Sequence, residues 1–154
     1  MFTAAEVFDL AIQVEANGER YYRFAQSRAI QGQLRELLAW LADQEVQHTG
    51  TLQQLKEEVC GPVGDLEEIP GLGRIALRSA MGRHAFSLDE LEIHSIRDEK
   101  ELLQVAIGFE EDSIQFYEFI AFFITEPRVL SIIDRIRAEE SDHKRLLIRK
   151  VSEG

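Results

Sequence analysis

The stretch that decides the fold is LADQEVQHTGTLQQL, residues 41–55. The three- and four-residue spacing of one helical face connects Leu41, Glu45, His48, Leu52 and Leu55. An ionised carboxylate taken out of water without a partner is strongly disfavoured, so an acid inside an apolar stripe needs compensation. We therefore expect a long helix whose buried face carries chemistry.

The same pattern returns 95 residues further along the chain. This register continues without a gap and also places apolar residues on apolar residues, such as Leu41 on Ile136. The sequence is thus two copies of one helical hairpin. The matched polar pairs are Glu15 with Glu110, Tyr22 with Tyr117, Glu45 with Glu140, and His48 with His143.

Start and stop signals place four helices around these residues. A capping box of Thr3 and Glu6 begins the first, Asp98 and Glu101 begin the third, and Pro127 suits the first turn of the fourth. The expected helices cover about 4–28, about 34 to the stop at 61–62, about 98–124 and about 127–151. Short, long and short connections between them predict an all-α four-helix bundle with one crossover.

One domain, 1–154, is expected to contain a first hairpin at about 4–60, a crossover at about 61–96 and a second hairpin at about 97–152. The crossover is rich in glycine and proline, and Ser87 and Glu90 are able to cap a brief helix inside it. His84 and His94 also lie there. They are expected at the surface, with closure of one of them over a buried site as the alternative.

Composition and charge limit the partners. The chain has 17 Lys and Arg against 28 Asp and Glu, for a formal net charge of −11, which argues against a nucleic-acid groove. The single cysteine, Cys60, rules out an intrachain disulfide and any centre built on CxxC pairs. No run approaches the roughly 20 apolar residues needed to span a bilayer. Met1 leads directly into a helical pattern, without the segments of a signal peptide, so we expect a cytoplasmic location and no membrane partner.

The polar pairs predict a metal centre. Each Glu-x-x-His pair puts a carboxylate and an imidazole on one helical face, and each remaining helix adds one glutamate. This is the ligand set of bundles that hold two iron or manganese ions. Mixed oxygen and nitrogen ligation suits both metals. We expect two iron ions, with manganese or a mixed pair as alternatives. The expected metal ligands are Glu15, Glu45, His48, Glu110, Glu140 and His143.

Other residues near the pattern have plainer expectations. Tyr22 and Tyr117 follow Glu15 and Glu110 by seven residues and so share their face, where they either donate hydrogen bonds to ligand carboxylates or serve only as core tyrosines. Three acids next to the ligands point away on a helical wheel and are assigned to solvent: Glu111, Glu139 and Asp142. Trp40 is expected to pack between helices or at a subunit contact.

The repeated set of Glu, Tyr and Glu-x-x-His resembles the rubrerythrin branch of the ferritin-like superfamily, across both hairpins. The resemblance implies that Glu45 and Glu140 bridge two irons, that Glu15 and Glu110 are terminal ligands, and that His48 and His143 each bind one iron. It also implies peroxide or oxygen chemistry and a homodimer. The apolar run with Phe119, Phe122 and Phe123 suits either a dimer contact or the core.

Two departures from that family bear on function. Rubrerythrins proper append a rubredoxin-like domain with two CxxC pairs, which this sequence lacks, so we expect an external electron donor such as a rubredoxin-like protein. They also commonly carry a further glutamate one turn after the third-helix ligand, where this chain has Ser113. That residue puts in doubt the redox-linked ligand exchange of the family.

These observations lead to an expected di-iron oxidoreductase, of peroxidase or ferroxidase type, that reduces hydrogen peroxide or dioxygen. The first alternative is ferrous-iron binding and oxidation for storage or delivery, which the acidic surface suits. The second is a metal-free interaction module that keeps the bundle.

Overall fold

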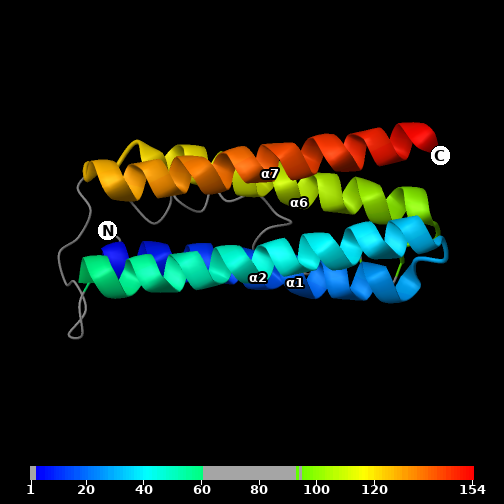
Figure 1. The fold of residues 1–154 in the computed structure, drawn as a ribbon, viewed down its shortest axis with the longest axis horizontal. Coiled ribbons are helices and arrows are strands. Elements are labelled where there is room, and N and C mark those ends of the chain that lie inside the picture. Colours follow the sequence, from blue (N-terminus) through cyan, green and yellow to red (C-terminus); the bar gives the residue numbers. More distant parts are fainter. Residues whose placement is uncertain (1–2, 61–92, 94) are drawn as a thin grey trace.

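The computed structural model describes residues 3–60, 93 and 95–154. Within them it shows four long helices: α1 (Ala4–Arg28), α2 (Gly32–Cys60), α6 (Glu99–Ala121) and α7 (Pro127–Glu153) (Figure 1). The predicted all-α four-helix bundle is therefore confirmed. The part of the crossover at 61–92 and residue 94 lies outside the described residues, so the expectations for Ser87, Glu90, His84 and His94 are not addressed.

The predicted helix starts have the expected caps. The Thr3 hydroxyl accepts a hydrogen bond from the Glu6 N–H at 3.1 Å, and the Asp98 carboxylate accepts one from the Glu101 N–H at 2.9 Å. At the start of α7 the Glu126 carboxylate accepts from the backbone N–H of Arg128 and Val129. These bonds satisfy N–H groups that have no partner inside a helix, and so they define where each helix begins.

The end of α6 differs from the prediction, which carried this helix to Ile124. Regular α-helix stops at Ala121, and the next three N–H groups bond to carbonyls three residues earlier, such as Phe123 N to Ile120 O at 3.0 Å. Such tightened bonds are common in a last turn. They lead the chain into the short connection before Pro127.

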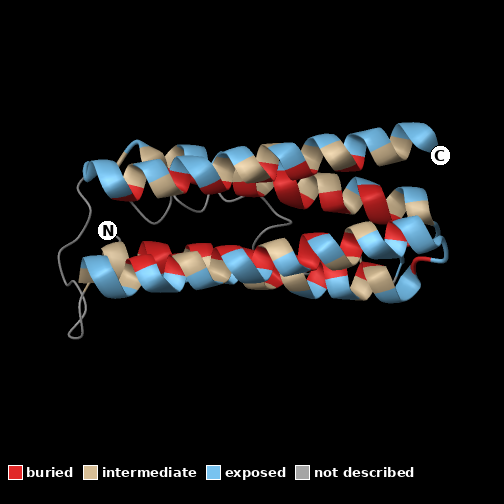
Figure 2. Cartoon of the chain, viewed as in Figure 1, coloured by how far each residue is buried: buried red, intermediate tan, exposed pale blue. Residues whose placement is uncertain are grey.

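The helices form two antiparallel pairs, α1 with α2 and α6 with α7, which lie side by side (Figure 1). Buried residues line the faces that the pairs turn toward each other (Figure 2). α2 ends at one end of the bundle and α6 begins at the other (Figure 1). No helix in the described part of the chain is long and apolar enough to cross a membrane.

The apolar core consists of two clusters, one toward each end of the bundle. The first includes Phe8, Phe116 and Ile133, and the second includes Tyr21 and Leu38. On every helix the buried glutamates and histidines of the repeat lie between residues of the two clusters. The bundle therefore surrounds its middle layer with apolar side chains on both sides.

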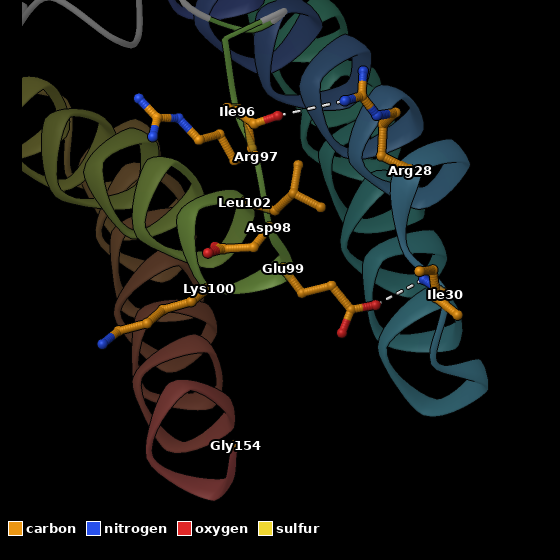
Figure 3. A pocket seen from close by; sticks show the side chains of 9 residues that line it. All are labelled: Arg28, Ile30, Ile96, Arg97, Asp98, Glu99, Lys100, Leu102 and Gly154. Atoms are coloured by element: carbon orange, nitrogen blue, oxygen red, sulfur yellow. Dashed lines mark hydrogen bonds between the residues drawn. The ribbon is translucent and has the colours of Figure 1, made fainter.

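One end of the bundle is tied together by hydrogen bonds between the hairpins. The Glu99 carboxylate at the start of α6 accepts from the backbone N–H of Ile30 at 2.7 Å and of Gln31 at 3.2 Å, in the turn between α1 and α2. The Arg28 guanidinium donates to the Ile96 carbonyl at 3.4 Å (Figure 3). These bonds anchor the turn to the second hairpin.

Candidate metal centre

Four glutamates and two histidines meet in the middle layer of the bundle. α1 and α6 each supply one glutamate, and α2 and α7 each supply a Glu-x-x-His pair. All six predicted ligands are buried, with exposed fractions of 4% or less: Glu15, Glu45, His48, Glu110, Glu140 and His143. The register found in the sequence thus brings the six side chains into one dry layer.

Ligand atoms of these residues form two groups of four, within each of which they lie no more than 4.8 Å apart. One group is Glu15, Glu45, His48 and Glu140, and the other is Glu45, Glu110, Glu140 and His143. Glu45 and Glu140 belong to both groups. Two cations held by these groups would share Glu45 and Glu140, and each cation would have one imidazole.

Several buried atoms of this layer have no hydrogen-bond partner: Glu15 Oε2, Glu110 Oε2, Glu140 Oε2 and His143 Nδ1. A buried polar atom without a partner costs about 1–3 kcal/mol, and more when the group is charged. Cations bound between these atoms would satisfy all of them at once. Because carboxylate oxygens and imidazole nitrogens together suit iron or manganese, the residues fit a two-metal centre.

The pKa shifts of three buried glutamates also reflect the cost of negative charge in this layer. Burial, reinforced by the charge of Glu140, raises the pKa of Glu15 to about 8, and the same two causes raise the pKa of Glu110 well above its ordinary value. Burial also opposes ionisation of Glu140, but interactions with Glu110 and the two imidazoles hold its pKa well below the usual range. In the metal-free layer these shifts favour protons on Glu15 and Glu110 and a negative charge on Glu140.

A proton on the His48 imidazole supplies positive charge next to the ionised carboxylate. Burial by itself lowers the pKa of this imidazole, but hydrogen bonding and charge from Glu140 and Glu15 outweigh it and raise the pKa to about 11. Its Nδ1 atom lies 3.0 Å from Glu140 Oε1 and 3.6 Å from Glu15 Oε2. A positive imidazolium therefore stands where a cation would otherwise interact with these carboxylates.

Tyr22 and Tyr117 have the first of the two expected roles. The Tyr22 hydroxyl donates to Glu110 Oε1 at 2.5 Å, and the Tyr117 hydroxyl donates to Glu15 Oε1 at 2.5 Å. Burial and the nearby carboxylates raise the pKa of both phenols well above 10, so both remain donors. Each bond joins α1 to α6 and orients one buried glutamate carboxylate.

Glu139 was expected in solvent, and the structure corrects this. Its side chain is 41% exposed, but Glu139 Oε2 lies 2.6 Å from His48 Nε2, so the carboxylate contacts a predicted ligand from outside. A helical wheel shows that Glu139 points away from the core of its own helix, but not that it points toward α2. The other two acids lie at the surface as expected, Glu111 beside Lys144 and Asp142 beside Arg145.

Trp40 packs between α2 and α7, which is one of the two positions expected for it. Its ring meets the His143 ring edge-on, with centroids 5.3 Å apart, and 44% of the residue is exposed. The two imidazoles stack with centroids 5.9 Å apart. His143 is therefore covered on its outer side by an aromatic ring, whereas His48 is met by a carboxylate.

Gly18 is a site residue that the sequence analysis missed. A Cβ atom on Gly18 would lie 3.0 Å from Glu45 Cδ and 3.2 Å from Glu45 Oε2. Glycine inside a helix costs about 1 kcal/mol relative to alanine, so it needs a reason to be there. The available signal was its position three residues after Glu15, on the same helical face. Gly18 leaves the space that a shared carboxylate occupies.

The fold and this layer together define a four-helix carboxylate protein with a buried Glu/His cluster that could hold metal. Residues 3–153 match the family model of the ferritin-like domain, and the chain belongs to that family. No curated protein sequence matches it significantly.

Two solved structures share the fold. One is a candidate ferritin-like diiron-carboxylate protein from Thermotoga maritima, 23% identical, with a TM-score of 0.79 over 99% of this chain and 96% of that chain. The other is a hypothetical protein from Pyrococcus furiosus, 20% identical, with a TM-score of 0.71 over 98% of this chain and 89% of that chain. At these identities the likeness establishes the fold.

Replacing Glu45 by alanine is expected to reduce metal binding to fewer than two ions per chain, because this carboxylate belongs to both four-residue groups. Metal analysis after anaerobic reconstitution with ferrous iron measures the effect. The matched control is Glu111→Ala, which removes a surface acid paired with Lys144 and should keep the wild-type stoichiometry. Two ions bound by Glu45→Ala would refute the bridging role.

Metal affinity is expected to rise with pH between about 6 and 8. The raised pKa of Glu15, about 8, means that this carboxyl holds a proton below pH 8 in the metal-free protein, and a cation must displace it. Titration calorimetry with Mn²⁺ at pH 7, in two buffers of different ionisation enthalpy, should show net proton release. Equal affinities at pH 6 and pH 8 would contradict this account.

Gly18→Ala is expected to weaken metal binding without destabilising the metal-free fold. The new methyl group meets the mobile end of the Glu45 side chain, which moves aside, while the helix gains up to about 1 kcal/mol in propensity. Gly50→Ala is the control, since nothing lies within 4 Å of a Cβ there. Thermal unfolding and metal titration of both variants measure the two effects, and unchanged affinity in Gly18→Ala would remove the role assigned to this glycine.

Proposed function

We propose that this ferritin-like protein is a di-iron oxidoreductase of the rubrerythrin type, which reduces hydrogen peroxide or dioxygen. The observation that carries the proposal is the pair of four-residue groups that share Glu45 and Glu140 and contain one imidazole each. The name of the Thermotoga maritima neighbour, a diiron-carboxylate protein, supports the same chemistry.

Peroxide is the preferred substrate. When bound, two ferrous ions supply the two electrons that cleave the O–O bond of one hydrogen peroxide, and two protons complete two water molecules. The chain contributes a water-excluded layer between two apolar clusters. It also fixes the terminal carboxylates, because Tyr22 and Tyr117 donate to Glu110 and Glu15 and keep their own protons.

Each turnover consumes two electrons, so a reductant must return them. The one cysteine of these 154 residues cannot build a rubredoxin-type centre, and the proposal assigns the return of electrons to a donor such as a rubredoxin-like protein. Ser113 is buried but has no carboxylate, so it cannot serve as an exchanging carboxylate ligand. In this proposal the ligand set therefore stays the same in both redox states.

A homodimer remains part of the proposal. Of the three phenylalanines considered for a subunit contact, Phe119 and Phe123 pack against the first core cluster. Phe122 is 86% exposed at the end of α6. It is therefore the member of that run which is available to a second copy.

Anaerobically reduced, iron-loaded protein is expected to be reoxidised by one equivalent of hydrogen peroxide per two irons, faster than by air-saturated buffer. The reason is that two neighbouring ferrous ions match the two-electron demand of peroxide. Stopped-flow absorption of the oxidised centre measures both rates. Slow or absent reoxidation by peroxide would rule out the peroxidase activity.

Iron storage or delivery is the second candidate, favoured by the net charge of −11, which attracts cations. Loading with excess ferrous iron separates the two functions, because an enzyme stops near two irons per chain whereas a storage protein accumulates many. A metal-free interaction module is less well supported, since it leaves the buried Oε2 atoms of Glu15, Glu110 and Glu140 without a hydrogen-bond partner. Absence of bound metal after anaerobic reconstitution would favour it.

A further inference from the structure

The two halves of the centre differ at positions that the 95-residue register makes equivalent. Glu139 on α7 corresponds to Gln44 on α2, and Trp40 on α2 corresponds to Arg135 on α7. The six predicted ligands are identical in the two halves. Within the centre, the halves therefore differ only in the residues around these ligands. Since the repeat provides an internal reference, these exchanges show where the halves have become unlike.

On the His48 side the imidazole is met by a carboxylate at each nitrogen. Nδ1 lies 3.0 Å from Glu140 inside the layer, and Nε2 lies 2.6 Å from Glu139 outside it. A carboxylate on the outer nitrogen orients the ring, leaves the inner nitrogen to a metal and strengthens it as a donor. The negative charge of Glu139 also attracts a cation bound on this side.

The described contacts of the His143 ring include no carboxylate on its outer side. Nδ1 of His143 has no hydrogen-bond partner, and the recorded carboxylate oxygens lie 3.6 Å away on Glu140 and 3.8 Å away on Glu110. The outer side of the ring is met by the edge of Trp40. The position equivalent to Glu139 holds the neutral Gln44.

We propose that the two metal positions are inequivalent, and that Glu139 is a positioning residue which makes the His48 position fill first and hold its ion more tightly. The proposal rests on the two-metal centre of the proposed function. Loss of an outer partner of a metal-binding histidine typically costs about 10- to 100-fold in affinity, which sets the expected size of the difference. Ordered filling also allows two different metals to be placed one after the other.

Titration of the metal-free protein with Co²⁺ under anaerobic conditions, followed by absorption and calorimetry, tests this directly. The wild type should bind two ions in two steps whose affinities differ by about 10- to 100-fold. Glu139→Gln should weaken the tight step by a similar factor and leave the weak step unchanged. Glu111→Gln, which removes one surface carboxylate elsewhere, should leave both steps as in the wild type.

The assignment of the tight step to one side needs two further variants. His48→Gln should abolish the tight step, whereas His143→Gln should retain it, and circular dichroism confirms that both are folded. Two ions bound with equal affinity, a tight step unaffected by Glu139→Gln, or a tight step lost only in His143→Gln would each overturn the proposal. Wild-type protein that binds no metal would overturn the two-metal centre itself, a result distinct from equal binding of two ions.

Discussion

The desolvation of four carboxylates in the middle of the bundle is the constraint on which the rest of the structure depends. Ionised side chains in a dry layer are tolerated only with positive charge close to them. In the metal-free protein that charge comes from protons, on Glu15, on Glu110 and on the His48 imidazole. Cations bound between the carboxylates would meet the same requirement.

The surroundings of the layer hold these costly groups in place. Apolar clusters above and below exclude water, and they are continuous along all four helices except where the ligands lie. The hydrogen bonds of Tyr22 and Tyr117 cross from one hairpin to the other and end on terminal carboxylates. These bonds therefore couple the geometry of the site to the contact between the two hairpins.

Much of the fold and of the candidate site could be predicted because each hairpin of the repeat can be compared with the other. Four helices and six inward ligands follow from periodicity, caps and the 95-residue register. The contact of Glu139 with His48 could not, because a helical wheel describes one helix and this contact depends on how α7 lies against α2. The role of Gly18 likewise depends on the approach of Glu45 from a neighbouring helix. The early end of α6 reflects local bonding in its last turn.

The division of the ligands between the hairpins has a consequence for the origin of the chain. Each hairpin carries two glutamates and one histidine of the set, and neither completes a four-residue group alone. An ancestral single hairpin with these residues would have needed a second, identical copy to form the centre, giving two equal halves by symmetry. Two copies in one chain do not have that requirement. In such a chain a substitution such as that of Gln44 or Glu139 could alter one half and spare the other.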